Sequence, residues 1–255
     1  MKSSKGVVFK RQQRILQLLQ ENHEMSVEDL SKELEVSEIT IRRDLQQFED
    51  QGVIERFYGG ARYLAGKIKK ENVDQIQYNS MKKNIARRAA GLVRDHDMVF
   101  INSGSTAFLL LNFLADVNVT ILTNNGRSIF KKPTTKASIV ISGGEIFEQK
   151  KSLVGDFAIN SFSKARAEIC FLGVGGISKN GISTYALPET AVNRVILERT
   201  TGHRIIVTEG FKVGRDSNFH TADCNMITHL ITDHTADPET VAYLKSIGVK
   251  VLFIS

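Results

Sequence analysis

The apolar positions of the first sixty residues recur with the period of an α-helix in three short segments, residues 11–24, 26–36 and 37–52. Ser26 and Asp29 have the spacing of a capping box at the start of the second segment. Three short helices with a very short turn between the last two are typical of a helix-turn-helix. The apolar positions that define the helices are Ile15, Leu18 and Leu19, then Val27, Leu30 and Leu34, then Ile41, Leu45 and Phe48.

The third predicted helix has an apolar face for the core and an opposite face on which Ile39 stands among polar residues. If this second face enters a major groove of DNA, Ile39 can lie against a thymine methyl group while Arg43 or Gln47 reads base edges. An exposed isoleucine is also common on ordinary protein surfaces, so Ile39 alone decides nothing. We expect the DNA contacts of this helix to come from Ser37, its N-cap, and from Ile39, Thr40, Arg42, Arg43, Gln46 and Gln47.

Residues 53–63 predict a small two-stranded wing after the third helix. Their apolar residues suggest two short strands, and Gly59 with Gly60 suits the tight turn between them. A wing beside a helix-turn-helix favours DNA binding over the alternative that the helical bundle docks onto another protein. The residues expected to approach the sugar-phosphate backbone are Arg56, Tyr58, Gly59, Gly60 and Arg62.

From about Asp97 onward, apolar runs with the length of strands alternate with helical stretches. This order predicts a mostly parallel, doubly wound α/β sheet. Most runs end in small or polar residues, and the carboxyl ends of parallel strands meet at one edge of a sheet, so these residues should converge on one ligand crevice. The runs are residues 97–104, 119–125, 137–144, 168–176, 203–210, 226–233 and 250–255.

The stretch FINSGSTAFLLLNFL, residues 100–114, predicts a strand, a small polar loop and an apolar helix. Unpaired N–H groups and hydroxyls at the start of a helix suit a phosphate group. Lys212 is the expected cationic partner, and its loop with glycines favours this role over the alternative of an ordinary surface lysine. The residues expected to contact an effector are Ser103, Gly104, Ser105, Thr106, Thr123, Asn124, Asn125, Ser142, Gly143, Gly144, Gly175, Glu189 and Lys212.

The net charge differs between the predicted DNA-binding domain and the segment that follows it. The 255 residues carry a net charge of +6, and residues 1–64 hold ten Lys or Arg and eleven Asp or Glu. Residues 65–90 hold seven basic residues and two acidic ones. This basic segment can lie along nucleic-acid phosphates or serve as a solvated linker.

Composition argues against several other classes of protein. No apolar run reaches the roughly 18 residues of a membrane span, and the first residues do not form a signal peptide. Two cysteines, Cys170 and Cys224, and six scattered histidines predict neither a disulfide framework nor a metal site. We therefore expect a cytoplasmic protein that needs no metal or cofactor and does not bind a membrane.

The N-terminal motifs resemble those of a known family. Arg11-x-x-x-Ile15 followed by SEITIRRDL, residues 37–45, is similar to the signature of the DeoR family of bacterial transcription regulators, and residues 52–61 resemble the wing that follows it. The similarity extends to about Asp233. It implies a C-terminal sensor domain related in fold to ribose-5-phosphate isomerase that binds phosphorylated sugars or similar metabolites.

Three positions depart from the family's pattern near the expected crevice. INSGST resembles the D-S-G-T-T loop with Asn102 in place of Asp, and PETAVNR resembles E-A-x-V-K-R with Asn193 in place of Lys. Gly175 stands where the related isomerases and many family sensors carry an acidic residue. EGFKVGR resembles D-S-S-K-F-G-R and keeps Lys212.

The expected organisation is a winged helix-turn-helix over residues 8–64, a basic linker over 65–80 and an α/β effector-sensing domain over 81–255. The expected function is a transcriptional repressor of carbohydrate catabolism genes that binds a double-stranded DNA operator and is released from it by a sugar phosphate. Because one recognition helix reads one half-site, we expect a homo-oligomer, a dimer or a tetramer.

Two other functions remain open at this stage. The α/β domain could be a sugar-phosphate isomerase or deaminase with an appended DNA-binding module, for which Glu145, Glu189 and Glu209 are the carboxylates near the crevice. The N-terminal bundle could instead dock onto a protein. A carboxylate that starts a helix, as Glu189 does, usually serves the helix itself, so we expect a sensor that is not an enzyme.

Overall fold

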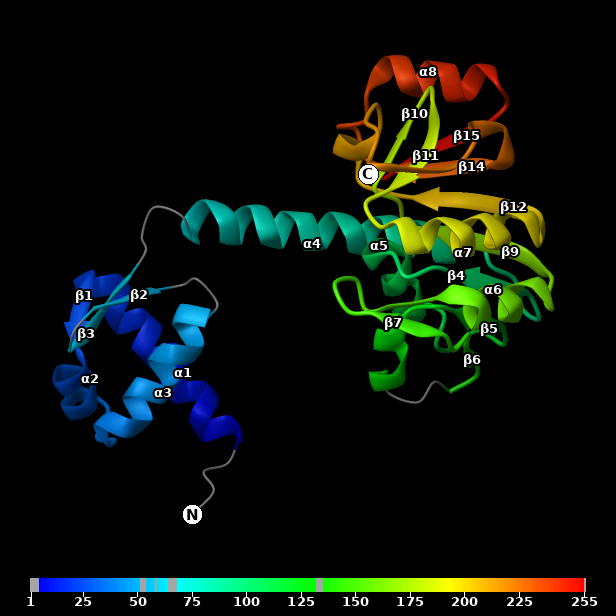
Figure 1. Ribbon diagram of the computed structural model, residues 1–255. Coiled ribbons are helices and arrows are strands. Elements are labelled where there is room, and N and C mark those ends of the chain that lie inside the picture. Colours follow the sequence, from blue (N-terminus) through cyan, green and yellow to red (C-terminus); the bar gives the residue numbers. More distant parts are fainter. Residues whose placement is uncertain (1–4, 51–53, 58, 64–67, 132–134, 255) are drawn as a thin grey trace. The chain divides into compact units, whose positions relative to one another are not determined.

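The computed structural model describes the chain apart from residues 1–4, 51–53, 58, 64–67, 132–134 and 255, and leaves undescribed the side chains of 5–10, 13, 20, 47, 50 and 68–78. The chain divides into two compact units, Met1–Gln77 and Tyr78–Ser255 (Figure 1). Among the described residues, no helix combines the length and the apolar content needed to cross a membrane.

Unit 1, Met1–Gln77, contains the three predicted helices and the predicted wing. The wing strands pair antiparallel, and a third strand that the apolar pattern did not predict completes the sheet in the order β1-β3-β2. The Ser26 hydroxyl accepts a hydrogen bond from the Asp29 N–H at 2.9 Å, which confirms the predicted cap. The elements are α1 (Lys5–Asn22), β1 (Glu24–Ser26), α2 (Val27–Glu33), α3 (Glu38–Asp50), β2 (Ile54–Phe57) and β3 (Gly60–Tyr63).

The turn of the wing requires its two glycines. Gly59 has a φ of +88°, which side chains rarely allow. A Cβ on Gly60 would lie 2.6 Å from the carbonyl oxygen of Met25, because β3 pairs closely with β1 at this point. The predicted Gly59-Gly60 turn is therefore confirmed, with a reason for each glycine.

A buried ion pair joins the first and third helices. The Arg11 Nε lies 2.6 Å from a carboxylate oxygen of Asp44, and the Gln12 amide donates to the other oxygen at 3.0 Å. Asp44 is 4% exposed, so the pair is fixed among the buried side chains of the unit. The core around it includes Ile15, Leu19, Leu30, Ile41, Leu45 and Ile54.

Unit 2, Tyr78–Ser255, is built on a seven-stranded parallel sheet in the order β15-β14-β12-β9-β4-β5-β6. Each predicted apolar run overlaps one strand of this sheet, and β9 and β12 begin before their runs, which confirms the parallel α/β class. The strands are β4 (Met98–Ile101), β5 (Thr120–Thr123), β6 (Ser138–Ile141), β9 (Ala167–Leu172), β12 (Thr200–Val207), β14 (His229–Thr232) and β15 (Lys250–Phe253).

Helices cover both faces of the sheet, as a doubly wound fold requires. Successive side chains of β4 point to opposite faces: Phe100 packs in one buried cluster, and Val99 and Ile101 pack in the other. The first cluster includes residues of α6 (Gly155–Ser163), α7 (Leu187–Glu198) and α8 (Pro238–Ser246); the second includes residues of α4 (Ile68–Ala90), α5 (Ser105–Phe108) and η1 (Leu109–Asn112).

Several elements of the structure were not predicted from the apolar pattern. Residues 65–80, expected as a linker, include the start of α4, and the boundary between the units falls between Gln77 and Tyr78.

Small antiparallel sheets also flank the crevice side of the fold. Their strands are β7 (Glu145–Phe147) with β8 (Ser152–Val154), and β10 (Gly176–Ser178) with β11 (Gly181–Thr184) and β13 (Phe219–Ala222); the remaining short helices are η2 (Gly126–Phe130), η3 (Gly210–Lys212) and η4 (Cys224–Met226).

Candidate functional site

The face of α3 that points away from the core of unit 1 is exposed. Ile39 is 80% exposed, and Arg42, Arg43 and Gln46 are exposed beside it. Within the part of the chain that the structure describes, Arg43 forms no ion pair, whereas Arg42 lies 3.1 Å from Glu38. The hydroxyls of Ser37 and Thr40 lie 3.0 Å apart at the start of the helix. The side chain of Gln47 lies outside the described residues.

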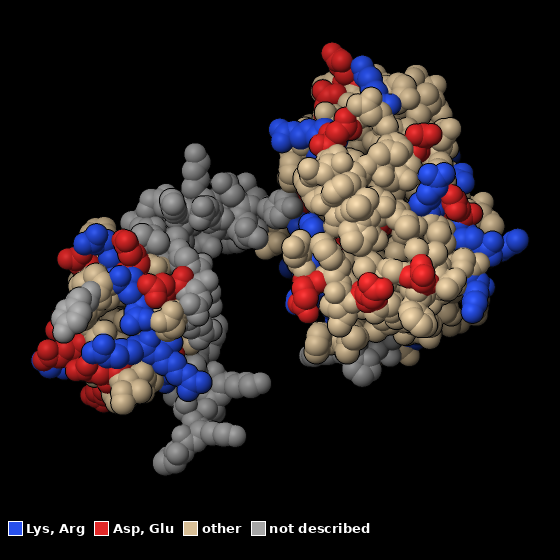
Figure 2. Space-filling view, in the orientation of Figure 1, with Lys and Arg blue, Asp and Glu red and all other residues tan. Residues whose placement is uncertain are grey.

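The wing arginines are held by acidic and amide side chains of the same unit. Arg56 contacts the Gln46 amide oxygen and lies 3.6 Å from Glu49. Arg62 lies 2.9 Å from Glu24, and the predicted contact Tyr58 lies outside the described residues. Figure 2 shows basic and acidic side chains intermingled on the visible face of this unit. The pair of Arg62 is exposed and that of Arg56 is partly exposed, and ion pairs near the surface contribute little to stability.

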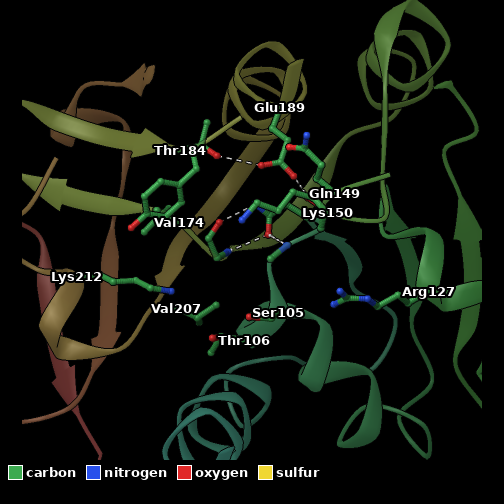
Figure 3. A pocket seen from close by; sticks show the side chains of 16 residues that line it. Ser105, Thr106, Arg127, Gln149, Lys150, Val174, Thr184, Glu189, Val207 and Lys212 are labelled. Carbon is green, nitrogen blue, oxygen red and sulfur yellow. Dashed lines mark hydrogen bonds between the residues drawn. The ribbon is translucent and has the colours of Figure 1, made fainter. Parts of the chain in front are cut away.

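Unit 2 contains a cavity of about 250 Å³ at the carboxyl ends of three neighbouring strands, β4, β9 and β12 (Figure 3). The loop after β4 lies against the loop after β9, since a Cβ on Gly104 would lie 2.6 Å from the Gly173 Cα. The lining residues are Asn102, Ser103, Gly104, Ser105, Thr106, Arg127, Gln149, Lys150, Gly173, Val174, Gly175, Thr184, Tyr185, Glu189, Val207 and Lys212.

The expected phosphate contacts meet in this cavity. Ser105 and Thr106 begin the short helix α5, and in Figure 3 Lys212 and Arg127 approach from opposite sides of them. Arg127 was not expected; it comes from η2, the short helix after β5. Two cationic side chains around a pair of hydroxyls suit a small anionic group.

Asn102 fixes the two glycine loops under the cavity. Its Oδ1 accepts hydrogen bonds from the N–H groups of Gly104 at 3.0 Å and Gly173 at 2.9 Å. Its Nδ2 donates to the Gly173 carbonyl at 2.9 Å and to Asn193 Oδ1 at 3.0 Å. Asn102 and Asn193, two of the departures from the family's pattern, are therefore partners in one buried contact.

Glu189 lines the cavity with both oxygens engaged. One oxygen accepts from the Ser103 hydroxyl at 2.8 Å and the other from the Thr184 hydroxyl at 3.0 Å. Glu189 is 7% exposed, and it joins α7 to the loop after β4 and to the end of β11. The carboxylate thus has a positioning role in this structure.

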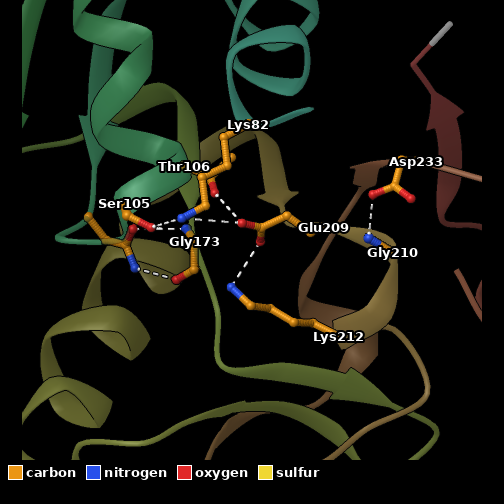
Figure 4. A network of polar contacts seen from close by, with 9 residues as sticks. Lys82, Ser105, Thr106, Gly173, Glu209, Gly210, Lys212 and Asp233 are labelled. Carbon is orange, nitrogen blue, oxygen red and sulfur yellow. Dashed lines mark hydrogen bonds and ion pairs between the residues drawn. The ribbon is translucent and has the colours of Figure 1, made fainter. Parts of the chain in front are cut away.

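A charged cluster lies beside the cavity (Figure 4). The fully buried carboxylate of Glu209 lies 2.9 Å from Lys212 Nζ and 3.5 Å from Lys82 Nζ, and Thr106 donates to it at 3.4 Å. Burial acts to raise the pKa of Glu209, but the charge of Lys212, its hydrogen bond and the charge of Lys82 lower it below the ordinary value. The Gly210 N–H donates to the Asp233 carboxylate at 2.6 Å and anchors the loop of Lys212.

Six expected effector contacts are not among the residues that line the cavity. Asn125 supports it from beneath, donating to the Ser103 carbonyl at 3.1 Å and accepting from the Arg127 N–H at 3.0 Å. Asn124 donates to the Leu153 carbonyl at 3.0 Å instead. The six residues are Thr123, Asn124, Asn125, Ser142, Gly143 and Gly144.

The cavity also has walls that sequence reasoning missed. Gln149 and Lys150 belong to the connection between β7 and β8, and Tyr185 follows β11. Lys150 Nζ lies 5.3 Å from the centre of the Tyr185 ring. These residues lie next to the short antiparallel strands, for which the apolar pattern contained no signal. Among the described residues, no group of three His, Cys, Asp or Glu is arranged to hold a metal ion.

Comparisons with known proteins match both units. Residues 11–66 match the DeoR-like helix-turn-helix domain, and residues 77–234 match the DeoR C terminal sensor domain. The HTH-type transcriptional regulator GolR of Listeria innocua is 29% identical over 248 residues, 95% of this chain and 97% of the relative. The putative aga operon transcriptional repressor of Escherichia coli O157:H7 is 29% identical, covering 96% and 93%. The lactose phosphotransferase system repressor of Staphylococcus aureus strain N315 is 27% identical, covering 91% and 94%.

Solved structures match part of the chain. Ribose 5-phosphate isomerase A of Methanocaldococcus jannaschii has a TM-score of 0.36 and 14% identity over 52% of this chain and 54% of that one. The eIF2B beta subunit of Chaetomium thermophilum has a TM-score of 0.38 and 15% identity over 56% and 45%.

Proposed function

Because this chain belongs to the DeoR family of transcriptional regulators, we propose that it represses genes of sugar utilisation and that a phosphorylated sugar in the cavity of unit 2 controls its affinity for DNA. Relatives over nearly the whole chain include a lactose phosphotransferase system repressor and a putative aga operon repressor. The first of these names connects a relative with the sugar lactose, and the polar lining of the cavity suits a phosphorylated ligand.

The observation that carries the proposal is the meeting of Ser105, Thr106, Arg127 and Lys212 around one cavity. Hydroxyls and two cationic side chains bind a phosphate group strongly because charge-assisted hydrogen bonds are the strongest available to it. Tyr185 and the amide of Gln149, which also line the cavity, offer apolar and hydrogen-bonding groups to a sugar.

On DNA, the exposed face of α3 is the reading surface in this proposal. Ile39 offers an apolar contact for a thymine methyl, and Arg43 has the fork geometry that matches a guanine edge. Arg56 and Arg62 of the wing would exchange Glu49 and Glu24 for backbone phosphates. Because one helix reads one half-site, the active form would be a dimer or tetramer, acting in the cytoplasm where its operator lies.

A sensing role accounts for the carboxylates better than an isomerase would. Isomerisation of a sugar phosphate needs a carboxylate free to take a proton from the substrate. Glu189 accepts hydrogen bonds from two hydroxyls, and Glu209 is paired with two lysines. Gly175 places no side chain on the loop that faces Tyr185. We therefore propose that the cavity binds its ligand without converting it.

The test is a fluorescence-anisotropy titration of the full chain on DNA from upstream of its own gene, at fixed salt, with a panel of phosphorylated sugars. Sequence-specific binding that one sugar phosphate weakens would support the whole proposal. Specific binding that no ligand changes would remove the effector part. Turnover of a sugar phosphate that is lost in Glu189→Gln would favour the enzyme instead.

A further inference from the structure

Lys82 reaches the edge of the cavity from the helix that leads out of unit 1. It lies on α4, one turn before the fully buried Ile85 and Ala86 that pack against the sheet. Its side chain is 12% exposed, and its Nζ donates to the Ser105 hydroxyl at 3.0 Å. Lys82 was expected only as one of the basic residues of the segment 65–90. In the structure it contacts the loop after β4, where the phosphate group is proposed to bind.

The same groups that suit a phosphate already hold a carboxylate. Lys82, Lys212 and Thr106 all contact Glu209, so two cations share one buried anion (Figure 4). Burial lowers the pKa of Lys82, and the charges of Lys212 and Arg127 lower it further against the attraction of Glu209. A second anion close to these cations would relieve their mutual repulsion.

We propose that Lys82 also binds the phosphate group of the ligand. In this proposal the Lys82 ammonium leaves Glu209 for the phosphate when the ligand binds, and this change of partner transmits ligand binding to α4. This inference rests on the proposed function, because it uses the same cavity and the same class of ligand. Glu209 acts as the internal competitor: it holds Lys82 and Lys212 until a stronger anion takes them.

The course of α4 makes Lys82 suited to this task. The helix runs from Ile68 to Ala90, and the boundary between the units falls inside it, between Gln77 and Tyr78. A ligand can shift a conformational equilibrium only through contacts that differ between the two states. Lys82 lies on a helix that has residues in both units, whereas Lys212 and Arg127 lie on short helices of unit 2. An exchange of Glu209 for phosphate at Lys82 therefore alters the forces on α4 directly.

The experiment uses the full chain and inorganic phosphate at constant ionic strength. Phosphate binding is measured by calorimetry, and DNA affinity by anisotropy with and without saturating phosphate. Lys82→Met should weaken phosphate binding about tenfold or more, the value of a lost charge-assisted hydrogen bond, and should abolish the effect of saturating phosphate on DNA affinity. Lys83→Met, at the exposed neighbouring position, is the matched control and should behave like the unmodified chain.

Two further variants separate this role from damage to the fold. Glu209→Gln should tighten phosphate binding because the internal competitor is removed, an effect that a misfolded cavity would not produce. Lys212→Met should weaken phosphate binding yet keep the response of DNA affinity once phosphate saturates the site.

The outcomes distinguish this inference from the proposed function. If Lys212→Met weakens phosphate binding while Lys82→Met binds phosphate and responds as the unmodified chain does, Lys82 has no such role and the proposed phosphate site stands. If Lys82→Met fails to fold, Lys82→Arg is used in its place and should keep phosphate binding. Unchanged phosphate affinity in Glu209→Gln would overturn the proposed exchange of Glu209 for phosphate. If the unmodified chain binds no phosphate, both proposals fail.

Discussion

Replacing Asn102 by aspartate should destabilise unit 2 strongly, although the two side chains have nearly the same shape. In the structure the Asn102 amide nitrogen donates to two buried oxygens, the Gly173 carbonyl and Asn193 Oδ1. An aspartate would put a charged oxygen against both of them and leave each without its donor. At about 1–3 kcal/mol for each buried group left unpaired, the expected cost is about 2–6 kcal/mol.

The pH dependence of this variant has a definite sign. Only the protonated carboxyl can donate to the Gly173 carbonyl, so its pKa in the folded chain would be raised above the unfolded value of about 3.9. The destabilisation is complete above that raised pKa and shrinks as the pH falls toward 3.9, relative to the unmodified chain.

A second substitution tests the cause of the effect. Asn193→Lys would supply a donor and a positive charge to the new carboxylate, restoring the Asp and Lys of the family's pattern. The double variant should recover about 2 kcal/mol or more of the sum of the single costs. Stability is measured by urea denaturation followed by circular dichroism, since the chain has no tryptophan. Strictly additive effects, or a cost of Asn102→Asp below about 0.5 kcal/mol, would refute the reasoning.

Three other substitutions probe the remaining parts of the molecule. Arg43→Ala should weaken operator binding by about 1–3 kcal/mol in anisotropy titrations; a uniform loss on all sequences with a shallower salt dependence would assign Arg43 to the DNA backbone instead. Gly175→Asp should abolish the response to ligand but leave DNA binding intact, because its Cβ would lie 2.5 Å from the Ser217 hydroxyl and 3.0 Å from the Tyr185 ring; a normal ligand response would contradict this. Arg11→Met should cost about 3–5 kcal/mol and unfold unit 1, because it leaves Asp44 buried without its cation; normal operator binding at raised temperature would show that the pair is dispensable.

The main elements could be predicted because their burial leaves a simple pattern. A strand covered on both faces has a continuous apolar run, as the central strands have, and the edge strand β6 is also apolar, so all seven strands of the parallel sheet could be predicted. Strands such as β10 and β11 are three and four residues long and contain glycine, and they have no such pattern. They were missed, and with them the wall of the cavity at Tyr185.

The site was predicted where a loop both follows a strand and faces the crevice. Ser105 and Thr106 meet this condition, and the cavity is lined by them. Asn125 follows a neighbouring strand with the same kind of side chain, yet it turns beneath the cavity to hold the Ser103 carbonyl. Composition cannot separate a lining residue from a supporting one, because the difference lies in which partner completes its hydrogen bonds. Lys82 and Glu209 are brought together only by the fold.

The close contact between Gly104 and Gly173 limits which residues that line the cavity can be changed. Any side chain at Gly104 would push its loop off the loop after β9, so a change there would deform the end proposed for phosphate. Gln149 and Lys150 lie in the connection between β7 and β8, and Tyr185 follows β11, so that constraint does not apply to these residues. Libraries of variants that seek a biosensor for a different sugar phosphate should therefore vary these three positions and leave Gly104 and Gly173 unchanged.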